Sequence, residues 1–189
     1  VVLPGNWRVN ARFSKVNSDG FLYRTNSDLY SYYGDLGWYG DKTQVVARFF
    51  GGKEKTGMGW DGVDYNTAYG IDGADRRYNP AGEYTDAEGN TKYYDNQTDN
   101  YAQQHAQLQI THRFTPNWSL NATLHYTHGG GYYEQYKNKS FEYWGLSRYI
   151  DVNGEKVKKA YGMYRKSLDN HFAGAIVSAK YVNEHVDVQ

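Results

Sequence analysis

The chain has 189 residues, with 21 Lys and Arg against 21 Asp and Glu, so its formal net charge is zero and no global basic field points to nucleic acid as a partner. The absence of Cys excludes a disulfide framework, a thiolate metal site and a Cys nucleophile. Aromatic residues make up 17% of the chain although its mean hydropathy is −0.88, and because disordered chains are poor in aromatic residues we expect an ordered protein.

Apolar and polar residues alternate along most of the chain, which predicts β-strands with one apolar and one polar face. The clearest case is 118–127, where Trp, Leu, Ala, Leu and Tyr alternate with Ser, Asn, Thr, His and Thr. In chain order we expect strands near 7–14, 30–38, 44–49, 107–114, 118–127 and 168–182, and the start of another at Val186.

The connections between these strands alternate in length. Short turns are expected at 3–6, 40–42, 115–117 and 183–185, and long connections near 17–28, 54–98 and 130–167. Structureless loops of that length are rare in compact soluble domains. Alternating short turns and long loops are typical of outer-membrane barrels.

Aromatic rings give a second signal. They flank the short turns at Trp7, Trp38, Tyr39, Phe114, Trp118 and Tyr181, and they recur along the strands at Phe13, Tyr30, Tyr32, Phe49, Tyr126 and Phe172. A spacing of about 6 to 9 residues in a strand tilted by about 40° spans roughly 15–23 Å, close to the ~25 Å lipid-facing band of such barrels. The pattern therefore predicts an all-β fold, an antiparallel up-and-down transmembrane β-barrel segment. The alternative is a soluble sandwich.

The number of strands predicts the domain organisation. The smallest membrane barrels have about eight strands, more than the six and a stub expected here. A half-barrel in lipid would leave unpaired edges. We therefore expect residues 1–189 to be a partial barrel domain, an internal segment of a larger protein.

Several stretches then carry a family resemblance: 18–21, 51–55, 60–63, 77–84, 94–101, 124–127 and 131–137, together with Gln104, His105 and Leu108. In order and spacing they resemble TonB-dependent outer-membrane receptors, particularly the iron-uptake type of Bacteroidota-like bacteria. The resemblance implies a barrel of about 22 strands around an N-terminal plug domain, which is not in this sequence.

The resemblance also implies a function and partners. Such a receptor lies in the bacterial outer membrane, contacts its lipid, and imports a scarce nutrient with energy passed by the TonB complex through the plug. The expected ligand is a small molecule such as a ferric siderophore, haem or cobalamin, and neither catalysis nor a resident cofactor is implied.

The connection 54–98 and the segment 130–149 are the expected ligand-facing surface. Aromatic rings beside Arg suit flat, anionic or aromatic ligands through stacking and charge-assisted hydrogen bonds. The candidate ligand-binding residues are Trp60, Tyr65, Tyr69, Arg76, Arg77, Tyr78, Tyr84, Tyr132, Tyr133 and Trp144. The alternative is that these rings pack the loops onto themselves and onto neighbouring loops.

We predict no metal site. His125 and His128 are three apart on a strand and so face opposite sides. His105 and His125 fall on polar, lumen-facing positions, where a hydrogen-bonded wall is favoured over an approach to haem iron. The run 86–90 spaces oxygen ligands like a calcium loop, but its Gly is out of register, which favours a hairpin turn.

No catalytic motif is present, so we predict that the protein is not an enzyme. Two other functions stay open. One is a secreted or surface β-domain that binds carbohydrate through exposed aromatic residues. The other is a glycoside hydrolase fragment with paired acids such as Asp61 and Asp64, although no pattern places them around a cleft.

Overall fold

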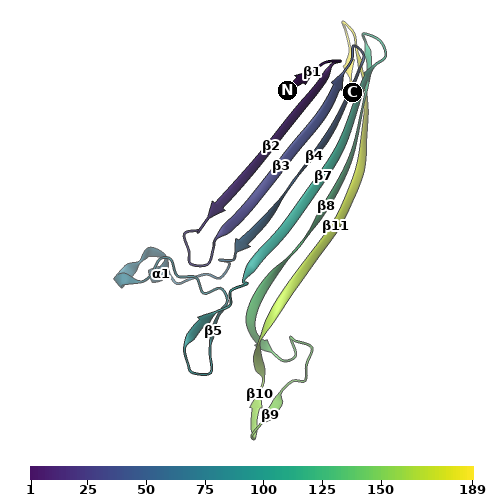
Figure 1. Ribbon diagram of the computed structural model, residues 1–189. Coiled ribbons are helices and arrows are strands. Elements are labelled where there is room, and N and C mark those ends of the chain that lie inside the picture. Colours follow the sequence, from purple (N-terminus) through teal and green to yellow (C-terminus); the bar gives the residue numbers. More distant parts are fainter.

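The computed structural model describes residues 1–189, and six long antiparallel strands form its main sheet (Figure 1). They are β2 (Trp7–Ser18), β3 (Ser27–Tyr39), β4 (Thr43–Gly57), β7 (Thr98–Arg113), β8 (Trp118–Ser140) and β11 (Lys159–Val182). The two-residue strands β1 (Val2–Leu3) and β12 (Asp187–Val188) pair with β2 and β11. Each long strand pairs with the long strands before and after it, which confirms the all-β, up-and-down prediction.

The connections sort to opposite ends of the sheet. Short turns and both termini lie at one end, here called the turn end (Figure 1). The other end, the loop end, carries the connections 19–26, 58–97 and 141–158. The second of these, 58–97, is called the long loop below.

Short elements lie within the loop-end connections. In the long loop they are α1 (Tyr65–Tyr69), the 3₁₀ turn η1 (Ile71–Gly73) and the hairpin of β5 (Glu83–Thr85) and β6 (Thr91–Tyr93). A further hairpin, β9 (Ile150–Val152) with β10 (Glu155–Val157), lies in 141–158. No helix here has the length and apolar character needed to cross a membrane.

The strands extend further at the loop end than the sequence pattern predicts. Strand β8 continues to Ser140, and β11 begins at Lys159 rather than near 168, with Lys159 paired to Ser140. The alternation of apolar and polar residues stops there, but backbone hydrogen bonds continue without it. At about 3.3 Å per residue, 23 residues make a strand of roughly 75 Å, which at a tilt of about 40° spans roughly 58 Å, about twice the height of a lipid-facing band.

One face of the sheet, the apolar face, carries aliphatic side chains between two belts of rings. Residues that pair across the strands share a face, and the continuous register aligns Ala11, Gly34, Phe49, Ala106, Tyr126 and Ala173. At the turn end, Trp118 and Tyr181 are in contact with ring centroids 4.9 Å apart. At the other belt Tyr32 stacks on Phe49 at 5.6 Å. Both belts are where the sequence pattern places them, with two exceptions among their residues.

Two predicted belt residues, Tyr39 and Phe172, lie on the other face. Tyr39 follows Trp38 on β3 and so points to the opposite side, where its ring lies 4.7 Å from the guanidinium carbon of Arg8; its assignment to the lipid-facing belt is wrong. Phe172 pairs with Thr127, and the pair lies on the same side of the sheet as His125, whose ring is 5.2 Å from that of Phe172. The neighbouring His171 pairs with His128 on the apolar face instead. The assignment of Phe172 to the lipid-facing belt is therefore wrong. Both faces of β11 are partly apolar, so composition does not fix its register.

The opposite, polar face is lined by a hydrogen-bonded row of side chains. Asn10 donates to Asp35 across β2 and β3 at 2.9 Å, and Arg48 donates to Gln109 across β4 and β7 at 3.0 Å. Gln109 in turn reaches Asn121 on β8. These contacts confirm the alternation predicted for the strands.

Neither face of the sheet packs against another layer. Only 12 of 189 residues are buried, and among them Met58, Asn79, Ala81, Glu134 and Phe141 lie in or against the loop-end connections. On the apolar face Phe49 and Leu124 remain 51% and 52% exposed. The sheet thus has no hydrophobic core of its own, and its apolar face is left open.

Candidate functional site

The long loop is anchored to the connection 19–26 through Asn79, which is 1% exposed. Its side-chain amide donates to the backbone oxygens of Tyr23 and Met58, both at 2.9 Å, and its Oδ1 accepts from the amide of Ala81 at 3.0 Å. Arg24 donates to the Asn79 carbonyl and lies over the ring of Tyr93, 3.6 Å from its centroid. One buried side chain thereby ties three backbone segments together.

A second anchor attaches the far end of the long loop to β8 and β11. The carboxylate of Glu134, on β8, accepts hydrogen bonds from the Tyr94 hydroxyl, from Asn96 at 2.8 Å and from Arg165 on β11 at 2.6 Å. Burial alone would raise the pKa of Glu134, but these three donors outweigh it and lower the pKa below its ordinary value. The bond to Glu134 raises the pKa of Tyr94 to about 12, so the carboxylate stays charged and the phenol stays protonated.

Four tyrosines pack around this second anchor. Tyr136 on β8 lies between Tyr94 and Tyr161, with ring centroids 5.3 and 5.4 Å away, and Tyr84 contacts it edge-on at 5.1 Å. Tyr84 is one of the predicted ligand-binding residues, and here its ring is used in packing.

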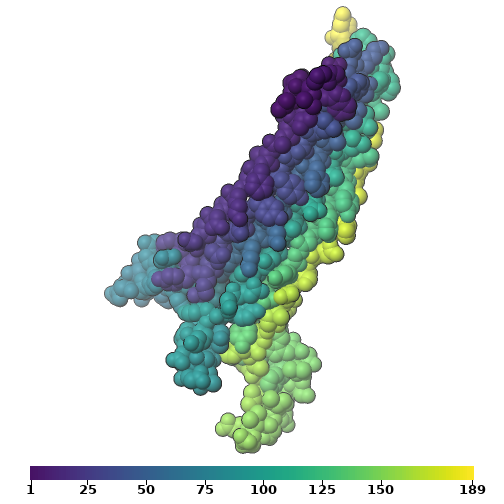
Figure 2. All heavy atoms as spheres, in the orientation of Figure 1, coloured from purple at the N-terminus to yellow at the C-terminus, as the bar shows by residue number.

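The exposed rings of the long loop lie near its start. Trp60 is 57% exposed and meets the edge of Tyr133 at 5.2 Å. Tyr65 and Tyr69 lie on one side of α1, 4.6 Å apart, and are 68% and 65% exposed. Asp64 caps this short helix by accepting from the amide of Thr67 at 3.0 Å, a bond that lowers the pKa of Asp64. Figure 2 shows this part of the loop projecting away from the sheet.

The other predicted ligand-binding residues make contacts within the protein. Arg77 donates to the Phe21 carbonyl at 2.9 Å, Arg76 lies over the Phe21 ring, and Trp144 donates to the Ala160 carbonyl at 3.2 Å. Tyr78 donates to Glu83, which raises the pKa of Tyr78 to about 12. The guanidinium of Arg165 lies 4.1 Å from the ring of Tyr132. The predicted residues thus form several groups rather than one cluster, and their role in ligand binding stays a prediction.

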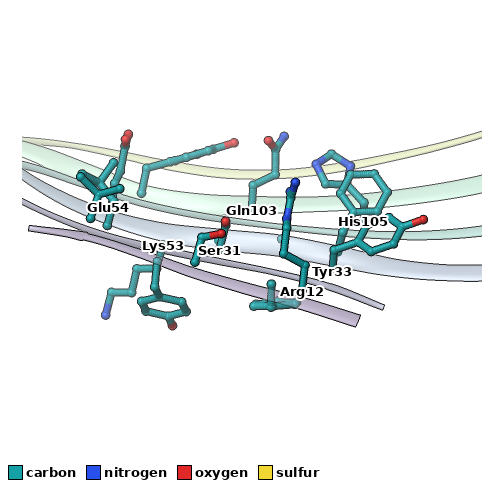
Figure 3. Close-up of a pocket in the computed structure, with 16 residues that line it drawn as sticks. Arg12, Ser31, Tyr33, Lys53, Glu54, Gln103 and His105 are labelled. Carbon is teal, nitrogen blue, oxygen red and sulfur yellow. The ribbon is translucent and has the colours of Figure 1, made fainter. Parts of the chain in front are cut away.

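A separate hollow of about 530 Å³ lies against the strands on the polar face. Tyr33, Phe50 and His105 form its aromatic wall: Phe50 stacks on His105 at 4.6 Å and lies 6.2 Å from Tyr33. Arg12 and Gln103 point to the same side of the sheet in Figure 3, whereas Lys53 points to the other side. Rings beside an Arg and an amide side chain can hold a flat polar group by stacking and hydrogen bonding.

The sequence analysis placed His105 on the polar face but did not predict this hollow. Its members come from β2, β3, β4 and β7, and only the register brings them together. Arg12 pairs with Tyr33, Tyr33 with Phe50, and Phe50 with His105, so the signal lies in strand pairing rather than in any local motif.

Two smaller sequence predictions concern turns and acids. Asp86 accepts from the amide of Asn90 at 2.7 Å and closes the turn between β5 and β6, which confirms a hairpin rather than a calcium loop. Asp64, offered above as one of two paired acids, is used as the cap of α1. Its contacts therefore explain its presence without a catalytic role.

Comparison of the sequence with protein-family models and with curated proteins gives no match. Comparison of the structure with solved structures finds the ferric-catecholate import receptor Fiu of E. coli K12 in its closed and open forms, with TM-scores of 0.60 and 0.62. Sequence identity is 11%, and the likeness covers 96% of this chain. The chain spans only 26% and 28% of the length of those receptor chains. The likeness shows the fold, that of a segment of a receptor barrel.

Proposed function

We propose that this chain forms part of the barrel wall of a TonB-dependent outer-membrane receptor that imports a ferric siderophore or a related iron complex. The observation that carries the proposal is the structural likeness to a ferric-catecholate import receptor along 96% of the chain. The family resemblance of the loop-end segments supports the same function independently.

The apolar face supports a place in the membrane. Its aliphatic side chains lie between two belts of rings, and no other layer of the chain covers them. A continuous exposed apolar surface marks a region that contacts a partner or lipid. A belt of rings at each edge is the arrangement that lipid-facing barrels use. In this orientation the loop end is extracellular.

The two outermost long strands support closure by strands from the rest of the protein. Beyond the short pairings with β1 and β12, the outer edges of β2 and β11 have no partner strand in this chain. Unpaired edges are not tolerated in hydrocarbon. Residues 1–189 would then be a partial barrel domain whose polar face, with its hollow, turns toward the lumen and the plug.

Chemistry at the loop end favours a flat, anionic ligand. Trp60, Tyr65 and Tyr69 offer exposed rings, and exposed Arg76 lies nearby in the same loop. Catecholate complexes of iron are flat in their aromatic parts and negatively charged, so rings and Arg suit them. Haem and cobalamin are the competing ligands of the same receptor class.

The proposal is tested by titrating the full-length receptor in detergent with the ferric complex of 2,3-dihydroxybenzoate, followed by tryptophan fluorescence. Each ring that stacks on the ligand contributes about 0.5–1.5 kcal/mol, so Trp60→Ala combined with Tyr65→Ala should weaken binding about tenfold. Tyr30→Ala, an exposed ring on the apolar face, is the matched control. An unchanged affinity in a correctly assembled double variant would show that these two rings do not contribute to ligand binding. If the protein bound haem or cobalamin saturably but did not bind the catecholate complex, the proposed ligand class would be wrong.

Exposed rings at the loop end would also suit a carbohydrate-binding domain, the second function left open by the sequence. Such a domain would be soluble without detergent, whereas the open apolar face predicts that the whole protein needs detergent or lipid. Partition of the whole protein in a detergent phase-separation assay distinguishes the two.

A further inference from the structure

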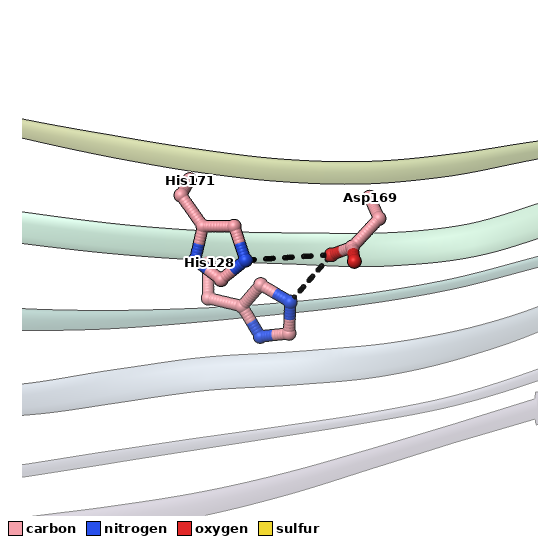
Figure 4. A group of neighbouring side chains, drawn as sticks. All are labelled: His128, Asp169 and His171. Carbon is pink, nitrogen blue, oxygen red and sulfur yellow. Dashed lines mark hydrogen bonds and ion pairs between the residues drawn. The ribbon is translucent and has the colours of Figure 1, made fainter.

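A group of metal-ligating side chains lies on the apolar face, away from the hollow and the loops. His128 on β8 pairs directly with His171 on β11, and Asp169 lies two residues along β11 on the same face. Nε2 of His128 is 2.8 Å from Oδ1 of Asp169, and Nε2 of His171 is 3.8 Å from the same oxygen (Figure 4). The three ligand atoms all lie within 4.8 Å of one another.

These separations suit a shared ion. Bond lengths of about 2.0–2.1 Å with tetrahedral angles place ligand atoms about 3.3 Å apart, between the two distances given above. The two imidazole rings are nearly parallel, 4.6 Å apart, so a modest rotation of each side chain would aim both nitrogens at one point. Asp169 and His171 are exposed and His128 is half-buried, so the rotation meets little obstruction and an ion can enter.

The surroundings favour a metal ligand at His171. Its Nδ1 lies 2.6 Å from the hydroxyl of Tyr126. With Nε2 on a metal, Nδ1 carries the proton and donates it to the Tyr126 oxygen, the kind of contact that fixes tautomer and ring orientation in metal sites. Gly130 lies opposite Asp169, and a Cβ there would be 3.7 Å from Oδ1 of Asp169 and 3.8 Å from Nε2 of His128. A larger side chain would therefore lie over the group, whereas glycine leaves it open.

We propose that His128, Asp169 and His171 bind a divalent transition-metal ion that links β8 to β11. Two imidazoles and one carboxylate suit Zn²⁺, Cu²⁺ or Ni²⁺, whereas Mg²⁺ and Ca²⁺ prefer sites made of oxygen alone. The remaining coordination positions face solvent or a bound small ligand. The ion would lie beside Tyr126, at the loop-end edge of the apolar band. The proposal does not depend on the transport function.

The sequence analysis missed this group because it compared His128 only with His125, and it compared histidines on neighbouring strands only for the polar face. It concluded that His125 and His128 face opposite sides, and the register agrees. The partner of His128 is on the neighbouring strand, and only the pairing with His171 brings the group together.

The test is a titration of the full-length receptor in detergent with ZnCl₂ by calorimetry, and with CuCl₂ by electron paramagnetic resonance. We expect a saturable site that is lost in the variant carrying both His128→Ala and His171→Ala, and a copper signal split by two imidazole nitrogens. Tyr126→Phe should keep the site but weaken it about tenfold, as expected when a partner of a metal ligand is removed. His125→Ala, on the same strand but the opposite face, should leave binding unchanged.

Two results would overturn the proposal. One is the same number of sites and the same affinity in the double variant as in the unaltered receptor. The other is a copper signal without splitting from imidazole nitrogen, a measurement on the unaltered protein that does not depend on a variant folding. Asp169→Asn adds a third check, because an unchanged affinity would contradict the carboxylate as a ligand.

Discussion

Replacing Leu124 by Arg places a charge on the apolar face at a depth that the structure defines. Trp118 and Tyr126 mark the two ring belts on β8. Their separation of about eight residues, at about 3.3 Å each and a tilt of about 40°, corresponds to roughly 20 Å across the band. Leu124 therefore lies about 5 Å from the midpoint. Arg at the midplane costs about 2–4 kcal/mol and almost nothing at the interface, so we expect about 2 kcal/mol for Leu124→Arg.

The assay is equilibrium unfolding of the full-length protein in lipid vesicles with guanidinium chloride. Ala122→Arg, at the midpoint of the band, should cost more than Leu124→Arg. Thr123→Arg, on the polar face opposite Gln109, should change the free energy of unfolding by about 0.5 kcal/mol or less. Equal costs for Leu124→Arg and Thr123→Arg, or costs that do not follow depth, would refute the assignment of the apolar face to lipid.

Three further predictions concern the loop end. A Cβ at Gly131 would lie 2.0 Å from a backbone oxygen of β7, whereas a Cβ at Gly129 would lie nearest to a phenol oxygen, which can move. Gly131→Ala should therefore destabilise the protein by about 1–3 kcal/mol in thermal unfolding, and Gly129→Ala should cost less. The reverse order would contradict the close approach of the two strands at Gly131. Arg165→Ala leaves the buried Glu134 carboxylate without its cation, so the attachment of the long loop should lose about 2 kcal/mol. The long loop should then be cleaved faster in limited proteolysis. An unchanged cleavage rate would argue against the anchor at Glu134. The pKa of Glu134 is lowered in the folded protein, so the stabilisation from Glu134 is complete above pH 4.5 and is lost as the pH falls through the folded-state pKa. The pKa of Tyr94 is raised from 10.0 to about 12, so the stabilisation from Tyr94 is complete below pH 10.0 and is lost as the pH rises toward 12. The near-ultraviolet circular dichroism should change in both pH ranges and stay constant between them.

The sequence was sufficient to predict the faces of the sheet because the two-residue period of a strand is a local property. From Trp118 to Tyr126 every second residue is apolar, and these side chains do lie on one face. The short turns could be predicted for the same reason, because each one interrupts the alternation of apolar and polar residues. Phe172 shows the limit: on β11 both faces are partly apolar, so a shift of one residue changes which ring faces outward.

The loop end could not be predicted in the same way because its contacts join distant segments. Tyr84 and Arg77 look like ligand contacts in the sequence, since exposed rings and cations are the usual means of binding a flat anion. The structure uses them to pack Tyr136 and to hold the Phe21 carbonyl. Buried Glu134 has no sequence signal at all, because its partners come from the long loop and from β11.

The up-and-down pairing also has a consequence for the order of folding. Each long strand needs only its neighbours in the chain, so hairpins can join the growing sheet one after another from either edge. The anchors of the long loop cannot form so early: Asn79 must reach Tyr23, 56 residues away in sequence, and Tyr94 must reach Glu134, 40 residues away. Contacts of such separation cost more loop-closure entropy than local ones and form later. The strands therefore provide a template on which the loop end is completed last.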